Sequence, residues 1–338
     1  MRLICLPCDP VSPGGYNRVA SDDLRRLGSV QGDVVCVYLE RGKAAAAKSL
    51  IVHRPRRGGW RQLVNLCRLK PFSNIGVSQL TRLVGALSVT DIFCGDVIFY
   101  DALRAMFPSK RMTVRFHNFF ALAAARHWWR GGAVDSHFRL TLGLTARLER
   151  RICNDDLVFP IFINPRERDL FQLMYPQREC DVWGVETELA AEVRLPTRPR
   201  LVYMGGTASH QVVGLKYLIA TVLPALRANH PSVELHLWGH GTQNFHAPHR
   251  GVFGYGFWAG EGLPLQGDGL FVIPDLFGGG IKVKTGDALS AGIAFITTPF
   301  GAEGYQFTPH PARMVCEMAE WHKTIEMFFY DNGILHGA

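Results

Sequence analysis

The chain has 338 residues, of which 47% are hydrophobic, 20% are charged and 11% are aromatic. This composition excludes a mainly disordered chain, because disordered chains are poor in apolar and aromatic residues. No apolar run reaches the length of about 18 residues that a membrane-spanning helix needs, and the start MRLICLPCDP is too short and too polar for a signal peptide. We therefore expect two domains and a cytoplasmic protein.

Eight cysteines are scattered along the chain. Without an export signal, a disulfide framework is not expected. Cys5 and Cys8 form one C-x-x-C pair, but no second pair completes a zinc site. We interpret these two as ordinary buried thiols, with redox or metal chemistry as the alternative.

The net charge of +8 is unevenly divided between the two halves of the chain. Residues 1–180 contain 27 Lys and Arg and 15 Asp and Glu, a net charge of +12, whereas residues 181–338 contain 10 and 14, a net charge of −4. A basic half joined to a mildly acidic half indicates that the first half meets an anionic partner. Nucleic acid, an anionic membrane and a phosphorylated acceptor are the candidates.

The first half alternates apolar strand patterns with helical ones. Strands are expected at 3–6, 34–39, 96–100, 112–116 and 158–162, and helices at 16–27, 136–153 and 165–174. A polar, proline-containing stretch at 180–200 joins this half to the next.

The second half repeats the alternation more clearly. Strands are expected at 201–204, 233–238, 251–254, 270–274 and 293–297, and helices at 213–228, 281–291 and 311–329. Alternation of this kind predicts the α/β class, with parallel sheets and crossover helices. Two such halves, each with a glycine loop after its first strand, predict a cleft where strand ends and helix N-termini meet a phosphate.

The segment 274–292, PDLFGGGIKVKTGDALSAG, resembles the donor-site motif of glycosyltransferase family 4, in its triple-glycine G-G-G-I-K-x-K branch. The loop GAEG at 301–304 and the strand–glycine units VYMGGT and ELHLWG upstream are also similar to that family. The resemblance implies a GT-B architecture of two Rossmann-like domains facing across a cleft. It divides the chain into an acceptor domain at 1–180, a donor domain at 181–310 and a closing helix at 311–338 that could cross back to the first domain.

The resemblance also implies a set of donor-binding residues. They are Gly14, Gly15, Arg18, Gly205, Gly206, Gly279, Gly280, Ile281, Lys282, Lys284, Asp287 and Glu303. Glycines let the main chain approach a diphosphate, and a helix beginning there presents its positive end. Lys282 and Lys284 add charge, but two residues apart on a helix they cannot share one face. A solvated helix start with structural glycines is the alternative.

Two acidic residues and one histidine carry more specific expectations. Asp287 stands where the family has the second Glu of its Glu–seven residues–Glu motif, which usually holds the ribose hydroxyls, and Gly279 stands at the first Glu. Glu303 lies in the 301–304 loop, where it would contact nucleotide or sugar. His117 follows an expected strand, and the resemblance implies a catalytic contact with the transferred sugar. The alternatives are that Asp287 is an exposed residue of a helix, that Glu303 lies in a plain turn, and that His117 has only a structural role.

Other carboxylates carry weaker expectations. We expect Glu149 to form an ion pair with Arg150 or its neighbours, with an orienting carboxylate beside the cleft as the alternative. No Asp-x-Asp motif occurs, and the adjacent pairs at 22–23 and 155–156 would diverge in regular structure. The chain is therefore expected to bind diphosphate without a metal or other cofactor, through N–H groups and cations.

The densest basic stretch, 53–72, contains Arg56, Arg57, Trp60 and Arg61. A tryptophan among arginines suits the interface of a membrane. We expect this face to meet an anionic membrane or a lipid-linked acceptor, with no nucleic-acid partner; a plain solvated surface and RNA binding are the alternatives.

These observations predict a glycosyltransferase that uses a nucleotide-diphosphate sugar, UDP- or GDP-linked, and a glycan or lipid-linked acceptor. Retention at the anomeric carbon and a place in cell-surface polysaccharide synthesis are what the resemblance implies. A non-catalytic GT-B-like scaffold is the alternative from another class, and an epimerase or phosphorylase is a minor one.

Overall fold

The computed structural model describes residues 1–8, 15–28, 34–39, 49–52, 60–71, 75–129, 136–207, 211–259, 263–264 and 268–335. The chain forms two compact units, unit 1 at Met1–Val185 and unit 2 at Glu186–Ala338. The division falls a few residues after the expected boundary at 180. Gly14, Arg56 and Arg57, which the sequence assigned to binding sites, lie outside the described residues.

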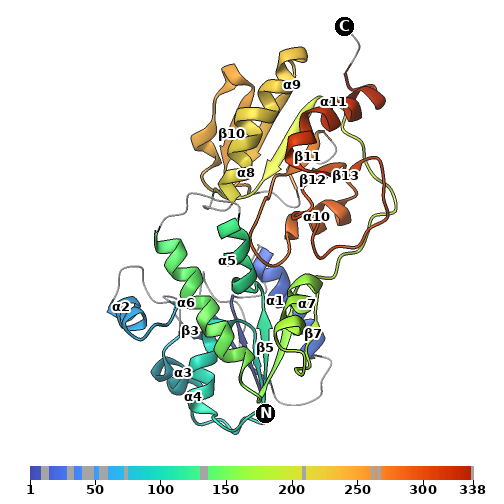
Figure 1. Cartoon of the computed structure of the whole chain (residues 1–338). Helices are drawn as coiled ribbons and strands as arrows, with labels where there is room; N and C mark the ends of the chain where they lie inside the picture. Colours follow the sequence, from blue (N-terminus) through green and yellow to red (C-terminus); the bar gives the residue numbers. More distant parts are fainter. Residues whose placement is uncertain are drawn as a thin grey trace. The chain divides into compact units, whose positions relative to one another are not determined.

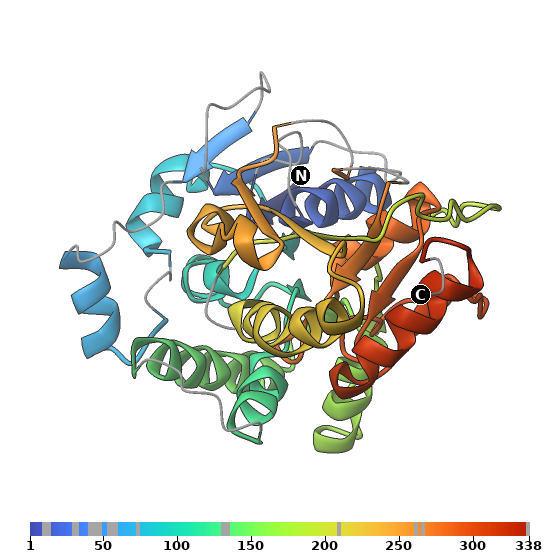
Figure 2. The same cartoon turned by 90° about the horizontal axis from the view of Figure 1, so that it is seen from above.

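In the described part of unit 1, parallel strands form one sheet in the order β3-β2-β1-β4-β5-β6-β7. They are β1 (Arg2–Leu6), β2 (Val34–Leu39), β3 (Ser49–Val52), β4 (Asp91–Cys94), β5 (Met112–Phe116), β6 (Val158–Phe162) and β7 (Asp181–Val182). The helices are α1 (Gly15–Gly28), α2 (Trp60–Cys67), α3 (Val77–Val84), α4 (Tyr100–Met106), α5 (Phe120–Trp129), α6 (Ser136–Cys153) and α7 (Pro165–Met174). Helices α5 and α6 lie side by side in both views (Figures 1 and 2).

In the described part of unit 2, the parallel sheet has the order β10-β9-β8-β11-β12-β13. The strands are β8 (Arg200–Met204), β9 (Glu234–Trp238), β10 (Val252–Gly256), β11 (Leu270–Ile273), β12 (Phe295–Thr297) and β13 (Arg313–Val315). A continuous helix consists of α8 (Gln211–Tyr217), a π-helical turn at Leu218–Val222 and α9 (Leu223–Asn229), and is followed later by α10 (Val283–Ala291) and α11 (Trp321–Asp331).

Both units share one topology. Numbering the first six strands of each unit along the chain gives the order 3-2-1-4-5-6, that of a Rossmann sheet. The order reverses between β1 and β4 in unit 1, and between β8 and β11 in unit 2. Ligands of such sheets bind beyond the carboxyl ends of the strands at these reversal points. The topology therefore marks two loop regions, one in each unit.

Successive residues of a strand point to opposite faces of the sheet, and each sheet is buried on both. In β8, Leu201 and Tyr203 join one buried apolar cluster, whereas Val202 between them joins another. In β1, Cys5 and Leu6 likewise belong to different clusters. This two-sided burial explains why the strands read as continuous apolar runs in the sequence.

The helix Gln211–Asn229 is long and apolar enough, by length and composition alone, to cross a membrane. Its Leu215, Leu218, Val222 and Leu226 are buried in the core of unit 2. Helix α9 contacts α11 on the same side of the sheet (Figure 2). These contacts are typical of a core helix of a globular unit, and such a helix can also have the length and apolar composition of a membrane-spanning one.

Two expected elements are wrong in type. The apolar run at 96–100, expected as a strand, is a 3₁₀ turn followed by the start of α4, because the Asp96 side chain accepts a hydrogen bond from Ile98 N and begins a helix. The strand itself lies earlier, at Asp91–Cys94. The expected helix at 311–329 is a short strand, β13, and then α11.

The closing helix belongs to unit 2. Trp321, Ile325 and Phe329 of α11 are buried in the same apolar cluster as Leu215 and Leu226. Its buried face completes the core of unit 2, and the possibility that the segment also crosses back to the first domain stays a prediction.

A buried ion pair lies inside unit 1. Arg115 of β5 is 1% exposed, and its Nε lies 3.3 Å from Asp23 Oδ1 of α1. The guanidinium also donates to the carbonyl oxygens of Phe162 and Trp183. Burial raises the pKa of Asp23 to about 6, against the opposing effect of the positive charges of Arg115 and Arg26. The pair fixes α1 to the sheet, because either charge alone would be costly to bury.

Replacing Asp23 with Asn should remove a pH-dependent loss of stability. The pKa of Asp23 is higher in the folded chain than its ordinary value of 3.8, so the protonated side chain stabilises the fold. This contribution to the free energy of unfolding is complete below about pH 4 and is lost as the pH rises through about 6. Between those limits, we expect the free energy of unfolding of the native chain to fall by about 2–3 kcal/mol relative to Asp23→Asn. Urea unfolding of both proteins across this range measures the difference, and a pH-independent difference would contradict the assignment.

Candidate functional site

The expected donor residues of unit 2 lie on loops that follow strands near the reversal point and on helix α10. Gly205 and Gly206 follow β8, the 274–282 segment follows β11, and Glu303 lies in the turn after β12. Because carboxyl ends of parallel strands meet at one edge of a sheet, the three loops are neighbours. Thr285 Oγ1 of α10 (Val283–Ala291) donates to the Gly301 carbonyl at 2.7 Å, which joins the helix after the second loop to the third loop.

Lys284 is the central charge of this region. Its Nζ lies 2.5 Å from Asp275 Oδ2 and 5.2 Å from the centroid of the Tyr203 ring. The Lys284 side chain is 13% exposed and that of Asp275 only 2%. Burial by itself lowers the pKa of Lys284, but the negative charge of Asp275, Tyr203 and the hydrogen bond to Asp275 outweigh burial and raise it above its ordinary value. Lys284 therefore stays protonated at physiological pH.

Lys282 lies outside the helix that the sequence predicted for it. Helix α10 begins at Val283, and Lys282 is the residue before it, with φ −97° and ψ 92°. Its Nζ donates to the Gly279 carbonyl at 3.0 Å and lies 4.4 Å from the centroid of the Phe300 ring. The two lysines therefore point to different partners because one precedes the helix, and not because they lie on two faces of it.

Two positions of the glycine triplet, 278 and 280, have a backbone conformation that favours glycine. Gly278 has φ 138° and Gly280 has φ 66°, conformations that L side chains rarely adopt. Ile281 and Lys282 then lead into the first turn of α10. The loop thus turns its main chain just before the N-terminus of α10, where N–H groups and the helix dipole favour negative charge.

Close backbone contacts pack the glycines after β8 against their neighbours. Gly205 N donates to the Trp238 carbonyl at 2.9 Å, and a Cβ at Gly205 would lie 2.6 Å from the Tyr203 hydroxyl oxygen. That hydroxyl donates to the Gly206 carbonyl at 3.0 Å. Tyr203 therefore supports both the glycine loop and the lysine above its ring.

The two acidic residues expected in the donor site differ in burial. Asp287 is half-buried on α10, one turn after Lys284. Glu303 is buried, in a turn where its own N–H donates to the Phe300 carbonyl at 3.2 Å. Asp287 shares α10 with Lys284, whereas Glu303 lies in the turn after β12, and the roles expected for both stay predictions.

In unit 1, His117 follows β5 and is buried. Its Nε2 lies 2.6 Å from the carbonyl oxygen of Gly95, which follows β4. Burial, and then the charge of Arg115, lower the pKa of His117 to about 3. A neutral ring beside a carbonyl acceptor carries its hydrogen on Nε2 and donates it. The catalytic role stays a prediction, and the hydrogen bond anchors the ring between two strand ends.

Glu149 serves a different purpose from the expected ion pair with Arg150. Its two carboxylate oxygens accept hydrogen bonds from Phe120 N at 2.8 Å and Ala121 N at 3.0 Å, at the start of α5. Glu149 is fully buried, and burial raises its pKa well above the ordinary value. The side chain therefore satisfies the first N–H groups of α5 and fixes the segment that begins at His117.

The remaining expected residues of unit 1 are placed as follows. Gly15 is the first residue of α1, and Arg18 of the same helix is half-buried. Trp60, the first residue of α2, is 75% exposed. Arg61 follows it in α2.

The adjacent aspartates of unit 1 are bound by arginines. Asp22 pairs with Arg25 of the same helix, and Asp23 with Arg115. Asp155 binds Arg104 at 2.7 Å, and Asp156 binds Arg178 at 2.8 Å. Across the described ranges, no group of three His, Cys, Asp or Glu residues could hold a metal ion.

Sequence reasoning missed Asp275 and Tyr203. Asp275 comes directly after the buried run Leu270–Ile273 and Pro274, where a parallel strand of this kind delivers its next polar residue to the ligand edge. This position after a buried strand was the sequence signal that could have identified Asp275 as a site residue. Nothing local indicates Tyr203, whose role depends on Lys284 of a different element.

No protein-family model and no curated protein matches the sequence significantly. Solved structures do match the fold. Sucrose-phosphate synthase from Thermosynechococcus elongatus aligns with a TM-score of 0.66 at 12% identity, over 98% of this chain and 90% of that chain. WaaG, a glycosyltransferase involved in lipopolysaccharide biosynthesis, aligns at 0.61 and 12% identity, over 99% and 92%.

Anabaena Alr3699/HepE in complex with UDP-glucose aligns with a TM-score of 0.59 at 13% identity, over 99% of this chain and 91% of that chain. The chain has the GT-B fold. The expected fold class is therefore confirmed, with two parallel sheets of Rossmann order.

His117 should stay neutral throughout the physiological range. Because its pKa is lowered to about 3, the ring nitrogens should show the Nε2–H tautomer with no titration between about pH 5 and 8. Long-range ¹H–¹⁵N NMR of the histidine rings, assigned with His117→Gln, makes this measurement. A His117 signal that titrates near pH 6 would show that the ring is not held as described.

Proposed function

We propose that the protein is a glycosyltransferase that takes its sugar from a nucleotide-diphosphate donor bound at the loops after β8, β11 and β12 of unit 2. The observation that carries the proposal is the buried, protonated Lys284 beside the Gly278–Gly280 loop, at the reversal point of the sheet. A diphosphate leaving group gains negative charge as the sugar departs, and preorganised cations and N–H groups stabilise that charge.

Two neighbours of the same fold support the choice of donor. The Alr3699/HepE structure is a complex with UDP-glucose, and a trehalose-6-phosphate structure from E. coli contains UDP-2-fluoro glucose. We infer a UDP- or GDP-linked sugar for this chain. Asp287 would accept from the ribose hydroxyls, and Glu303 would contact nucleotide or sugar.

In the proposed reaction, Lys284 and the loop N–H groups hold the diphosphate, while His117 contacts the transferred sugar. The neutral His117 ring, fixed through Nε2, can act as a hydrogen-bonding group but not as a cation. No metal is needed, because the lysines and N–H groups supply the positive field. Retention at the anomeric carbon and a glycan or lipid-linked acceptor complete the proposal.

The donor site is tested by removing the Lys284 charge without leaving its partner alone. Lys284→Gln by itself would strand the Asp275 carboxylate in a buried setting, at a cost of about 3–5 kcal/mol. The double variant Lys284→Gln/Asp275→Asn avoids this. We expect its affinity for UDP-glucose or GDP-mannose to fall by about 1.5–3 kcal/mol, the range for a lost charged hydrogen bond.

Calorimetric titration measures the affinities, and Lys323→Gln, an exposed change on α11, is the control. Release of UDP or GDP then measures turnover. Binding with no turnover on any glycan or lipid-linked acceptor would favour the scaffold alternative. No binding of either nucleotide sugar by the native chain would reject the donor site.

We also propose that unit 1 contacts an anionic membrane from the cytoplasmic side, at α2 and the basic segment before it. Trp60 is 75% exposed, and Leu63 of the same helix is 49% exposed. Exposed aromatic and aliphatic groups next to arginines suit the boundary between headgroups and acyl chains. A lipid-linked acceptor would be met at such a surface.

Flotation with anionic and neutral vesicles tests this contact. Neutralising Arg56, Arg57 and Arg61 together should release the protein, because each basic residue near an anionic surface contributes about 1 kcal/mol. Trp60→Ala should weaken binding with less dependence on salt, since it removes an apolar anchor. Changing Lys216, Arg250 and Lys323 of unit 2 to Gln is the matched control. Equal release by both triple variants, or no flotation at low salt, would reject the membrane contact.

A further inference from the structure

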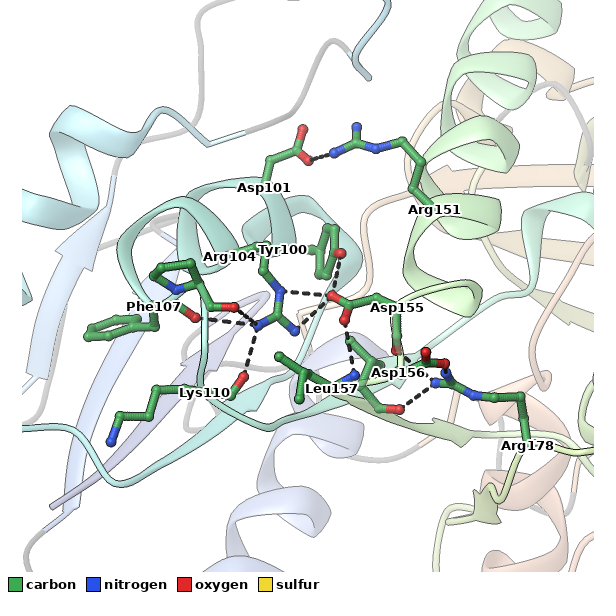
Figure 3. A network of polar contacts seen from close by, with 12 residues as sticks. Tyr100, Asp101, Arg104, Phe107, Lys110, Arg151, Asp155, Asp156, Leu157 and Arg178 are labelled. Atoms are coloured by element: carbon green, nitrogen blue, oxygen red, sulfur yellow. Dashed lines mark hydrogen bonds and ion pairs between the residues drawn. The ribbon is translucent and has the colours of Figure 1, made fainter.

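A second group of charges lies at the other edge of the sheet in unit 1. It is formed by the loops before β5 and β6, so it lies at the amino ends of the strands, whereas His117 follows the carboxyl end of β5. Figure 3 shows Arg104 directed at Asp155, and Arg151 directed at Asp101. The group therefore lies at the opposite end of the strands from His117.

The aspartate of this group is already neutralised. Asp155 Oδ2 accepts from the Tyr100 hydroxyl and from Arg104 Nε, both at 2.7 Å. Its Oδ1 accepts from Leu157 N at 3.0 Å. Arg104 in turn donates to the Lys110 carbonyl at 2.8 Å (Figure 3). One positive charge thus balances one negative charge, in a fixed arrangement.

A second aspartate, Asp101, has two cations beside its single carboxylate. Asp101 Oδ2 lies 2.8 Å from Lys70 Nζ, and its Oδ1 lies 2.5 Å from Arg151. The Asp101 side chain is buried, while the Arg151 side chain is 49% exposed. Two cations share one carboxylate, so Arg151 retains binding capacity toward solvent.

A cavity of about 590 Å³ opens on this group. It is lined by Tyr100, Arg147, Arg150, Arg151, Asn154 and Asp155. Arg147, Arg150 and Arg151 lie three and four residues apart on α6 and hence on one face of the helix. Within the ranges that the structure describes, no acidic side chain pairs with Arg147 or Arg150, both of which are exposed.

We propose that this cavity binds a phosphate group, held by the guanidinium groups of Arg147, Arg150 and Arg151. Arginine presents planar donors that match phosphate oxygens, and pairs of them bind phosphate more strongly than neutral donors do. The neutralised Asp155 does not oppose an anion, and the cavity has the size of a small-molecule site. A position in the last turn of α6 would also favour Arg150 and Arg151 through the helix dipole, so the test includes a control for that effect.

The test uses the full chain with saturating UDP, so that any nucleotide site in unit 2 is filled. The probes are inorganic pyrophosphate and dihexanoyl phosphatidic acid below its critical micelle concentration, each titrated by calorimetry at low salt. We expect Arg147→Gln/Arg150→Gln to weaken both by at least about tenfold. Arg82→Gln, an exposed arginine in the last turn of α3, should change neither.

The ratio of the two native affinities identifies the source of the phosphate. Tighter binding of dihexanoyl phosphatidic acid assigns a lipid headgroup, and tighter binding of pyrophosphate assigns a soluble phosphate. If neither probe binds the native chain, or if the double variant binds both as Arg82→Gln does, the site is rejected. Thermal unfolding confirms that the variants fold, and Arg147→Gln alone, outside the last turn of α6, replaces the double variant if that one does not. Failure of UDP to bind leaves this comparison intact, because all the substitutions lie in unit 1.

Discussion

Burying an ammonium group is costly unless an opposite charge and hydrogen bonds accompany it, and Lys284 shows how unit 2 meets that requirement. Asp275 supplies the charge at 2.5 Å, and Tyr203 lies beneath the lysine with its ring centroid 5.2 Å away. Thr298 Oγ1 donates to the Asp275 carbonyl, so the loop after β12 fixes the loop after β11. Asp275 therefore links Lys284 of α10 to the loop after β12, and the ring of Tyr203 from β8 packs against the lysine.

Unit 1 positions its groups through hydrogen bonds to the main chain. His117 is held by a carbonyl of the neighbouring strand end, and the segment after it is held by Glu149 through two N–H groups of α5. Burial keeps the His117 ring uncharged, with a pKa lowered to about 3. The two units therefore offer a proposed reaction different groups: a lysine fixed in an ion pair with Asp275 in one, and in the other a fixed neutral ring whose Nδ1 is a hydrogen-bond acceptor.

The sequence predicts most of this fold because strands buried on both faces appear as apolar runs between glycines and polar turns. It fails where burial and periodicity disagree. The run at 96–100 is as apolar as a strand, yet the Asp96 side chain caps a helix start within it. Glu149 could not be assigned either, because its partners are backbone groups of residues 120 and 121, almost thirty positions away in the chain. The local sequence pattern predicts the helices and strands, whereas the site depends on contacts between residues that are far apart in the chain.

The division of charge along the sequence acquires a more exact meaning from these pairings. A net charge of +12 in residues 1–180 treats every arginine as available to an anion. Arg115 is instead consumed inside the unit by Asp23, and Arg104 and Arg178 by aspartates at the amino edge of the sheet. Among the described residues, the exposed arginines on α6 are examples of cations that stay available to an anionic partner, because the carboxylates near them are already neutralised. The net charge of a segment therefore does not show which of its cations can bind an anion, because some of them are already paired with carboxylates. Two faces of equal net charge can differ in what they bind.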